Sequence, residues 1–432
     1  MKINIHKFGP IENASIQLAP MTIFTGNSNL GKSYVNYLTY FLMKCTSPDE
    51  LFAFFDSKRG RKNEFTMPIA DIQSWMHEKV ESFMREFLNA PEITCNVTFE
   101  LIPSNPKIDF HFKYEELKTQ DNNTDLFGDF LRDTKQIRVT IDDNVEEFML
   151  PRMIKGKSYG LGVAFSGYIQ NVLFGKQIHQ AMILPPARGA FVGENYTLKE
   201  KIASSVGMYR RFLNDYDYAT QFGAYRKKDA NRYVEQIERL IGGKLITKEG
   251  KQYLVLRNGN ELPLSAAASS IKELSPLLYT LQGMRRTISF CIEEPEAHLH
   301  PQMQIAMVDL LATCFNDGFL FQFTTHSDYV MQRINQLIKL EYIRKKDKQQ
   351  FENICAKFGL SERQCINKED IKVYFFEANN EGNVVINDLQ VEKGGFPLVT
   401  FFDVVEDMTV IEDALNNVIE DIKSKEDDGD KE

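Results

Sequence analysis

The stretch Thr25-Gly26-Asn27-Ser28-Asn29-Leu30-Gly31-Lys32-Ser33 fits the phosphate-binding loop pattern G-x-x-x-x-G-K-[ST]. The apolar run 21–24 before it predicts a buried strand, and residues 34–43 after it, beginning with Tyr34, predict a helix. Backbone N–H groups of such a turn, together with the positive end of the helix, form a site for a triphosphate. We therefore expect residues 26–34 to bind ATP, with Lys32 on the β- and γ-phosphates and the Ser33 hydroxyl on Mg²⁺.

Length and composition bound the class of protein. The chain has 432 residues, of which 43% are hydrophobic and 26% charged, so it can fold around a large core. The formal net charge of -9 argues against a surface coated with nucleic acid, although it does not exclude a local basic patch. Six scattered cysteines without a C-x-x-C pair predict buried thiols in a reducing compartment. Because no apolar run approaches the roughly 20 residues of a membrane span, we expect a cytoplasmic protein without membrane contact.

A second motif places paired carboxylates at the end of an apolar strand. It reads Ile288-Ser289-Phe290-Cys291-Ile292-Glu293-Glu294-Pro295-Glu296-Ala297-His298-Leu299-His300-Pro301. In P-loop ATPases one such carboxylate holds the Mg²⁺ shell and the next polarises the attacking water. We expect these roles for Glu293 and Glu294 respectively, and solvated glutamates at a strand end are the alternative. The segment 296–301 is better explained as a loop at a subunit interface than as a metal site built from its glutamate and histidines.

A third motif, Phe319-Leu320-Phe321-Gln322-Phe323-Thr324-Thr325-His326-Ser327, predicts another buried strand, which ends in a histidine. An imidazole at that place could hydrogen-bond the γ-phosphate and hold the water and Glu294 in register. His326 is therefore a candidate catalytic residue beside Lys32 and Glu294.

Two further segments carry candidate nucleotide-binding residues. The short apolar strand 181–184 ends at a turn with two prolines, which places Arg188 at the carboxyl edge of a sheet, where ligands bind in α/β folds. Pairing of this arginine with a nearby carboxylate is the alternative. Ser269 and Ser270 stand where the N-cap residues of a helix belong. Capping is the ordinary role of such serines, and a nucleotide contact is a second one.

With these motifs in this order, the chain resembles the ABC-type ATPase heads of the RecF, SMC and OLD-related group. The specific parts are Phe8-Gly9-Pro10-Ile11-Glu12, the segment 293–301 and Thr324-Thr325-His326-Ser327, and the resemblance covers residues 1–45 and roughly 181–330. It implies that the turn 184–188 matches a P-A-x-R-like motif whose arginine faces the nucleotide. It also implies that Ser269, Ser270 and the residues after them match the signature helix.

The same resemblance implies a head-to-tail homodimer, or a higher homo-oligomer, that encloses ATP. One subunit would supply the phosphate loop, the paired carboxylates and the histidine, and the other would supply Ser269 and Ser270. ATP binding would close the dimer and hydrolysis would open it. Three departures stand out: Glu293 replaces an aspartate, as in OLD-like members, Ser270 replaces the signature glycine, and no lobe-linking glutamine can be assigned.

The expected fold class is α/β: a P-loop ABC-type ATPase head with a mixed sheet, flanking helices, an antiparallel β layer and an inserted helical and β lobe. The expected segments are a discontinuous ATPase core, a mixed α/β insertion, a helical lobe with short strands, a C-terminal completion of the core and an acidic tail. The ATPase core spans residues 1–45 and 181–330, the mixed insertion 46–180, and the helical lobe 195–264. The C-terminal completion of the core spans 331–420 and the acidic tail 421–432.

These features favour an ATPase switch of a prokaryotic antiphage defence system, similar to stand-alone ATPases of the Septu or PARIS type. Such a switch controls a separate effector, often a nuclease or a Toprim-like protein. The chain has no long heptad arm, unlike SMC proteins, and no motif of a fused nuclease. A RecF-like repair ATPase that binds duplex DNA is the alternative, which the basic stretches at 58–62 and 226–228 allow and the net charge disfavours. A transporter subunit is disfavoured by the insertions and the divergent signature.

Overall fold

The structure is a computed structural model of the chain. The residues that it describes are 1–59, 62–117, 134–151, 157–176, 178, 180–192, 207–224, 233–248, 251–283, 288–398, 406 and 408–420. The predicted acidic tail 421–432, the basic stretch 226–228 and two residues of the basic stretch 58–62 lie outside the described residues.

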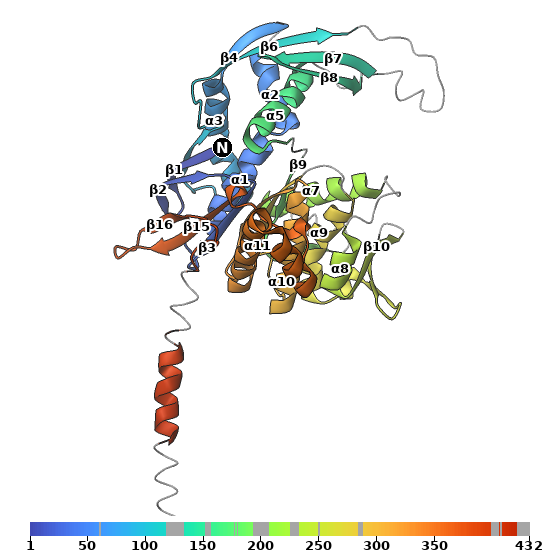
Figure 1. The fold of residues 1–432 in the computed structure, drawn as a ribbon. Coiled ribbons are helices and arrows are strands. Elements are labelled where there is room, and N and C mark those ends of the chain that lie inside the picture. The colour runs from blue at the N-terminus through green and yellow to red at the C-terminus, as the bar shows by residue number, and fades with distance from the viewer. Residues whose placement is uncertain are drawn as a thin grey trace, which may run out of the picture.

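A six-stranded sheet forms the centre of the molecule (Figure 1). Its order is β16-β15-β3-β14-β13-β9, and only β16 runs antiparallel to its neighbour. The strands are β3 (Met21–Gly26), β9 (Gln180–Leu184), β13 (Ile288–Glu293), β14 (Leu320–Thr324), β15 (Ile371–Ala378) and β16 (Val384–Leu389). Every residue of β9, β13 and β14 is buried, as continuous apolar runs predict for strands covered on both faces. The carboxyl ends of the five parallel strands lie along one edge, where all three sequence motifs end.

A three-stranded antiparallel layer lies beside this sheet, as predicted. In it β1 (Lys2–Phe8) pairs with β2 (Ile11–Gln17) on one side and with β5 (Cys95–Glu100) on the other. The hydroxyl of Tyr374 on β15 ties the layer to the sheet, because it donates to the carbonyl of Gln17 (3.0 Å) and accepts from its N–H (2.8 Å). Since β5 comes from the predicted insertion, part of that segment completes the core.

The remaining part of the insertion forms a lobe of helices and strands at the top of Figure 1. Its antiparallel sheet has the order β4-β6-β7-β8. The elements are α2 (Pro48–Arg59), β4 (Glu64–Pro68), α3 (Ile69–Leu88), β6 (Asp109–Glu116), β7 (Thr134–Ile141), β8 (Asn144–Pro151) and α5 (Lys157–Phe174). The sequence predicted α3 with its observed bounds and missed α2 and α5. These two helices pack so closely that a Cβ at Gly162 would lie 2.8 Å from the carbonyl oxygen of Pro48.

A second lobe follows β9 and the 3₁₀ turn η1 (Arg188–Phe191). Its elements are α7 (Gly207–Ala224), α8 (Val234–Ile241), β10 (Gly243–Lys248), β11 (Lys251–Leu256), β12 (Glu261–Pro263) and α9 (Ser269–Gly283). The three short strands form the predicted sheet. The expected capping role of Ser269 and Ser270 is corrected: they are the first two residues of α9, because the N–H groups of Ile271 and Lys272 bond to the carbonyl of Ala268 (both 3.0 Å).

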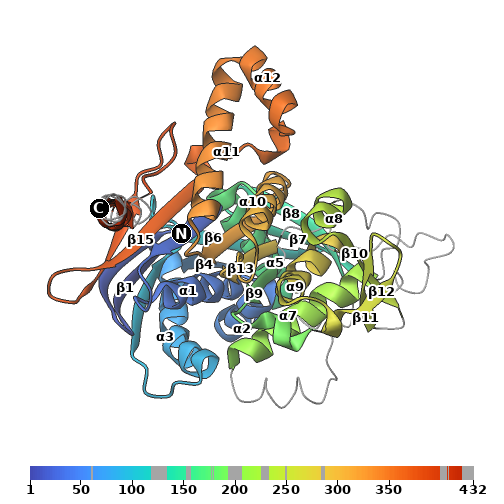
Figure 2. The same ribbon diagram turned by 90° about the horizontal axis from the view of Figure 1, so that it is seen from below.

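Helix α10 (Pro301–Asn316) follows the acidic motif, and α11 (Asp328–Lys346) and α12 (Lys348–Phe358) follow the motif that ends in His326 and Ser327. The sequence predicted α11 and missed α10 and α12. Figure 2 shows that α11 and α12 project from the rest of the molecule. No residue of α12 is fully buried, but Phe351, Ile354 and Cys355 lie on one face of the helix and are partly buried against the core.

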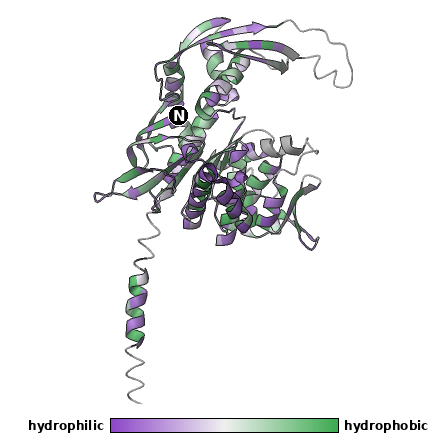
Figure 3. Ribbon diagram, viewed as in Figure 1, coloured by the Kyte–Doolittle hydropathy of each residue, from purple (hydrophilic) through white to green (hydrophobic). Residues whose placement is uncertain are grey.

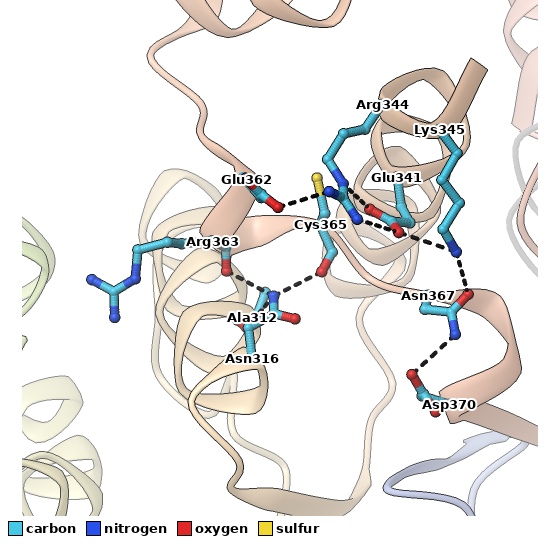
Figure 4. A network of polar contacts seen from close by, with 10 residues as sticks. All are labelled: Ala312, Asn316, Glu341, Arg344, Lys345, Glu362, Arg363, Cys365, Asn367 and Asp370. Carbon is cyan, nitrogen blue, oxygen red and sulfur yellow. Dashed lines mark hydrogen bonds and ion pairs between the residues drawn. The ribbon is translucent and has the colours of Figure 1, made fainter. Parts of the chain in front are cut away.

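A polar network ties α10 and α11 to the chain that leads into β15 (Figure 4). Arg344 donates to both carboxylate oxygens of Glu341 (2.6 and 2.9 Å) and to Glu362 (2.7 Å). The side chain of Asn316 donates to two carbonyls of the segment after α12, each at 2.8 Å. The base of the projecting helices is thereby fixed to the core.

The described helix at 408–420 falls within the helix predicted at 400–422. All of its residues are exposed, and Figure 3 shows apolar and polar turns alternating along it. None of the helices in the described ranges combines the length and apolarity needed to cross a membrane. The predicted fold class is confirmed by the mixed sheet, its flanking helices and the antiparallel layer.

Candidate nucleotide-binding and catalytic site

The phosphate loop lies between β3 and α1 (Lys32–Cys45), where the pattern predicts it. Gly26, Asn29 and Gly31 have φ values of 111°, 63° and 88°, and asparagine tolerates this left-handed region better than other residues with a side chain. A Cβ at Gly26 would lie 2.2 Å from a backbone oxygen of β15, so no side chain fits there. Asn27, Ser28 and Asn29 are exposed. The loop thus has the glycine-lined, solvent-facing form that a phosphate cradle needs.

Leu30 and Tyr34 anchor the loop by packing against the core. The ring of Tyr34 lies against Phe8, with centroids 5.0 Å apart, and a Cβ at Gly9 would lie 2.4 Å from that ring. The motif before the phosphate loop therefore serves to seat the start of α1.

The ammonium of Lys32 lies inside the loop. It donates to the carbonyls of Gly26 (3.1 Å) and Asn27 (2.5 Å). Burial lowers the pKa of Lys32 to about 8, while the negative charges of Glu294 and Glu293 oppose this change. A triphosphate in the loop would supply the further negative charge that keeps a buried ammonium protonated.

The residues proposed for Mg²⁺ meet directly. The hydroxyl of Ser33 donates to Oε2 of Glu293 (2.6 Å), which also accepts from the Thr324 hydroxyl (3.0 Å), and Oε1 accepts from the side-chain amide of Asn36 (2.8 Å). Burial raises the pKa of Glu293, and the three hydrogen bonds counteract this rise. Mg²⁺ prefers oxygen ligands at about 2.1 Å, so adjacent ligand oxygens lie roughly 3 Å apart. The hydroxyl and carboxylate therefore fit this ion.

Asn36 and Thr324 are site residues that the sequence did not reveal. Asn36 lies one helical turn after Ser33 and also donates to the carbonyl of Ile292 (3.0 Å). Thr324 ends the strand next to β13, so its hydroxyl reaches Glu293 and accepts from the N–H of Glu294 (3.2 Å). The helical spacing would have suggested Asn36, whereas Thr324 depends on strand order.

The three candidate catalytic side chains also converge. Glu294 follows β13 in the left-handed region (φ 45°), which costs roughly 1–3 kcal/mol and is frequent at functional sites. Burial and the positive charge of Lys32 lower the pKa of His326, and Glu294 opposes this shift. The net lowering of its pKa favours the neutral form of the His326 imidazole. Glu294 and His326 are both exposed on the same face as the phosphate loop.

Arg188 lies in the interior, where its guanidinium is bonded to groups of the protein, and the nucleotide contact expected from the sequence stays a prediction. Its guanidinium donates to the carbonyls of Glu273 (2.9 Å), Pro185 (3.1 Å) and Glu293 (2.8 Å). Its Nε also lies 3.7 Å from Oε2 of Glu273, which is the carboxylate pairing kept as the alternative. The side chain therefore joins α9 to the end of β13.

Replacement of Arg188 by alanine is expected to lower the free energy of unfolding by roughly 3–5 kcal/mol, because buried carbonyls and Glu273 lose their charged partner. Arg188→Lys keeps the charge but lacks the planar fork, so we expect an intermediate loss. Urea unfolding measures both. A variant of unchanged stability that binds ATP more weakly would instead indicate direct nucleotide contact.

Ser269 is exposed and Ser270 half-buried in the first turn of α9. Among the described contacts, none joins either serine to the phosphate loop of the same chain. Through Glu273 and Arg188, however, their helix is linked to Glu293.

His300, the second histidine after the acidic pair, has a structural role. Nδ1 of His300 accepts from the N–H of Gln302 (3.4 Å), so His300 caps α10 with Pro301 at its first position. Within the described part of the chain, no group of three His, Cys, Asp or Glu side chains is arranged to hold a metal ion.

The fold and the site define a P-loop ATPase domain of the ABC type. The chain belongs to the AAA ATPase domain family, whose model matches residues 50–331, a range that includes both carboxylates and His326 and begins after the phosphate loop.

Solved structures of SMC head domains are distantly similar to this chain. An SMC head bound to the C-winged helix domain of ScpA is 11% identical, with 91% of this chain and 98% of that chain covered and a TM-score of 0.37. The SMC head domain from Thermotoga maritima is 10% identical, with 90% and 98% covered and a TM-score of 0.34. A search of curated proteins gave no match. The assignments below depend on the chain's own geometry.

Proposed function

We propose that this chain binds ATP with Mg²⁺, hydrolyses it to ADP and phosphate, and uses this cycle to close and open a homodimer that controls a separate effector protein. The observation that carries the proposal is the convergence of Lys32, the Ser33–Glu293 pair, Glu294 and His326 at one edge of the central sheet. Membership of the AAA ATPase domain family supports the nucleotide chemistry.

Each side chain has a distinct task in this proposal. Lys32 would exchange its loop carbonyls for phosphate oxygens, and Ser33 and Glu293 would hold Mg²⁺, which would supply positive charge beside the phosphates. Glu294 accepts a hydrogen bond from the attacking water and orients it toward the γ-phosphate. The neutral imidazole of His326 donates to a γ-phosphate oxygen. The Thr324 hydroxyl binds both acidic residues, so it keeps the metal-binding and water-orienting groups in fixed relation.

Exposure of the catalytic face supports the dimer. Glu294, His326 and the tip of the phosphate loop are exposed, whereas transfer of a phosphoryl group to one oriented water benefits from exclusion of bulk water. A second copy that brings Ser269 and Ser270 over the nucleotide would provide that cover. The link from α9 through Arg188 to β13 would then transmit closure between the lobes.

The effector role is proposed to be antiphage defence, with the effector encoded beside the gene for this chain. Cells that express both genes are expected to reduce phage plaque formation, because the ATPase cycle would release or activate the effector. Lys32→Ala, expressed at the same level, is expected to abolish the protection. Equal protection by this variant, or none by the wild-type pair, would contradict the role.

A further inference from the structure

Glu296 is a glutamate of the acidic motif that none of the roles above uses. Its Oε1 accepts from the hydroxyl of Thr325 (2.7 Å) and from the backbone N–H of His326 (2.9 Å). Its Oε2 is buried and has no hydrogen-bond partner in the described structure. The carboxyl group therefore reaches from the loop after β13 to the two residues that follow β14.

Packing alone does not account for a carboxyl group at this place. Burial raises the pKa of Glu296, and the hydrogen bonds from Thr325 and the N–H of His326 act against that rise. A buried oxygen without a partner costs roughly 1–3 kcal/mol, which an apolar side chain of the same size would avoid. The other oxygen of Glu296, in contrast, holds the hydroxyl of Thr325 and the N–H of His326.

A second connection joins the same two segments. Gln304 of α10 donates to the carbonyl of Leu299 (2.9 Å), and its side-chain oxygen accepts from the hydroxyl of Ser327. The loop 294–300 is thus fixed to the segment 325–327 at two places, directly through Glu296 and through Gln304 at Leu299. A shift of the loop cannot leave His326 in place without breaking one of these contacts.

We propose that Glu296 is a positioning residue: by holding the N–H of His326 and the hydroxyl of Thr325, it fixes the imidazole beside Glu294 and couples His326 to the loop 294–300. The catalytic part of this inference rests on the proposed ATP hydrolysis. Because Glu294 and His298 in that loop are exposed, a subunit that docks on it would shift the imidazole as well.

Two variants of matched size test the role in the full-length chain. Glu296→Gln keeps the acceptor oxygen, and its amide nitrogen takes the place of Oε2, whereas Glu296→Leu removes the acceptor. We expect Glu296→Leu to lower kcat for ATP roughly tenfold to a hundredfold with little change in KM, since small displacements of reacting groups cost about this much. Glu296→Gln should retain most of the turnover. Thermal melting checks that each variant folds, and Glu296→Ala replaces the leucine variant if that one does not.

A measurement independent of activity follows the imidazole itself. The ring signal of His326, one of seven histidines, is assigned by NMR from its loss in His326→Gln. Without nucleotide, we expect one narrow signal in the wild type and in Glu296→Gln, and a shifted or broadened signal in Glu296→Leu. An unchanged His326 signal in the leucine variant would overturn the inference, whatever its turnover. Absence of turnover in the wild type would refute the proposed function instead, and the NMR comparison would still decide the positioning role.

Discussion

Lys32→Ala is expected to weaken ATP binding about a hundredfold or more, because it removes the one buried cation of the phosphate loop. The ammonium already lies inside the loop on two carbonyls, so it reaches the phosphates by exchanging partners rather than by moving the backbone. A charge-assisted contact to a triphosphate in a partly desolvated site is worth several times a surface contact. Calorimetry or a fluorescent ATP analogue measures the affinity directly.

The matched control for this variant is Lys348→Ala. The Lys348 side chain is 86% exposed and pairs with Glu352 only at 3.9 Å, so its loss should leave both ATP affinity and stability unchanged. Thermal melting of Lys32→Ala shows whether the loop carbonyls tolerate the missing donor. Wild-type ATP affinity in a folded Lys32→Ala protein would rule out the phosphate-loop assignment.

Glu294→Gln is expected to bind ATP normally, to hydrolyse it roughly 10²- to 10⁴-fold more slowly, and to accumulate as an ATP-bound dimer. Glutamine preserves the shape of the side chain but accepts the water's proton poorly. The pair proposed for Mg²⁺ is untouched, since Ser33 and Glu293 bond to each other and not to this side chain. Phosphate release gives the rate, and light scattering after gel filtration with ATP gives the mass.

Glu352→Gln is the control, because this exposed glutamate lies on α12, away from the catalytic motifs. It should keep wild-type turnover and the wild-type mass. A Glu294→Gln protein that turns over ATP at full rate would remove Glu294 from its assigned role. If that variant binds ATP but stays a monomer, the result would support the catalytic role of Glu294 and contradict the ATP-driven dimerisation.

Much of the fold could be predicted because its signals are local. Residues that are close together in the sequence determine the strand–loop–helix unit at Lys32, the buried strands β13 and β14, and the amphipathic helix α3. Helix α5 was missed because its sequence is apolar around most of its circumference and contains three glycines, which hides the helical period. Helix α12 was missed although Phe351, Ile354, Cys355 and Phe358 have helical spacing, because the segment is short and rich in polar residues.

The site was predictable in its residue types and less so in its contacts. The motifs indicate Ser33, Glu293 and His326, but the contacts that orient them depend on which strands lie side by side. Thr324 reaches Glu293 only because β14 pairs with β13. The strand-end pattern correctly places Arg188 at the sheet edge, yet it cannot say that the guanidinium turns inward to three carbonyls.

The contacts of Arg188 have a consequence for how related sequences can diverge. The guanidinium binds three main-chain oxygens, which every amino acid supplies, so the side chain at 185 can change without loss of these hydrogen bonds, whereas Glu273 also supplies the nearby carboxylate. No other side chain offers a planar, permanently charged fork at position 188 itself. Divergent relatives with this joint should therefore share the arginine together with an acidic residue at 273, whereas the residue at 185 need not covary with the arginine.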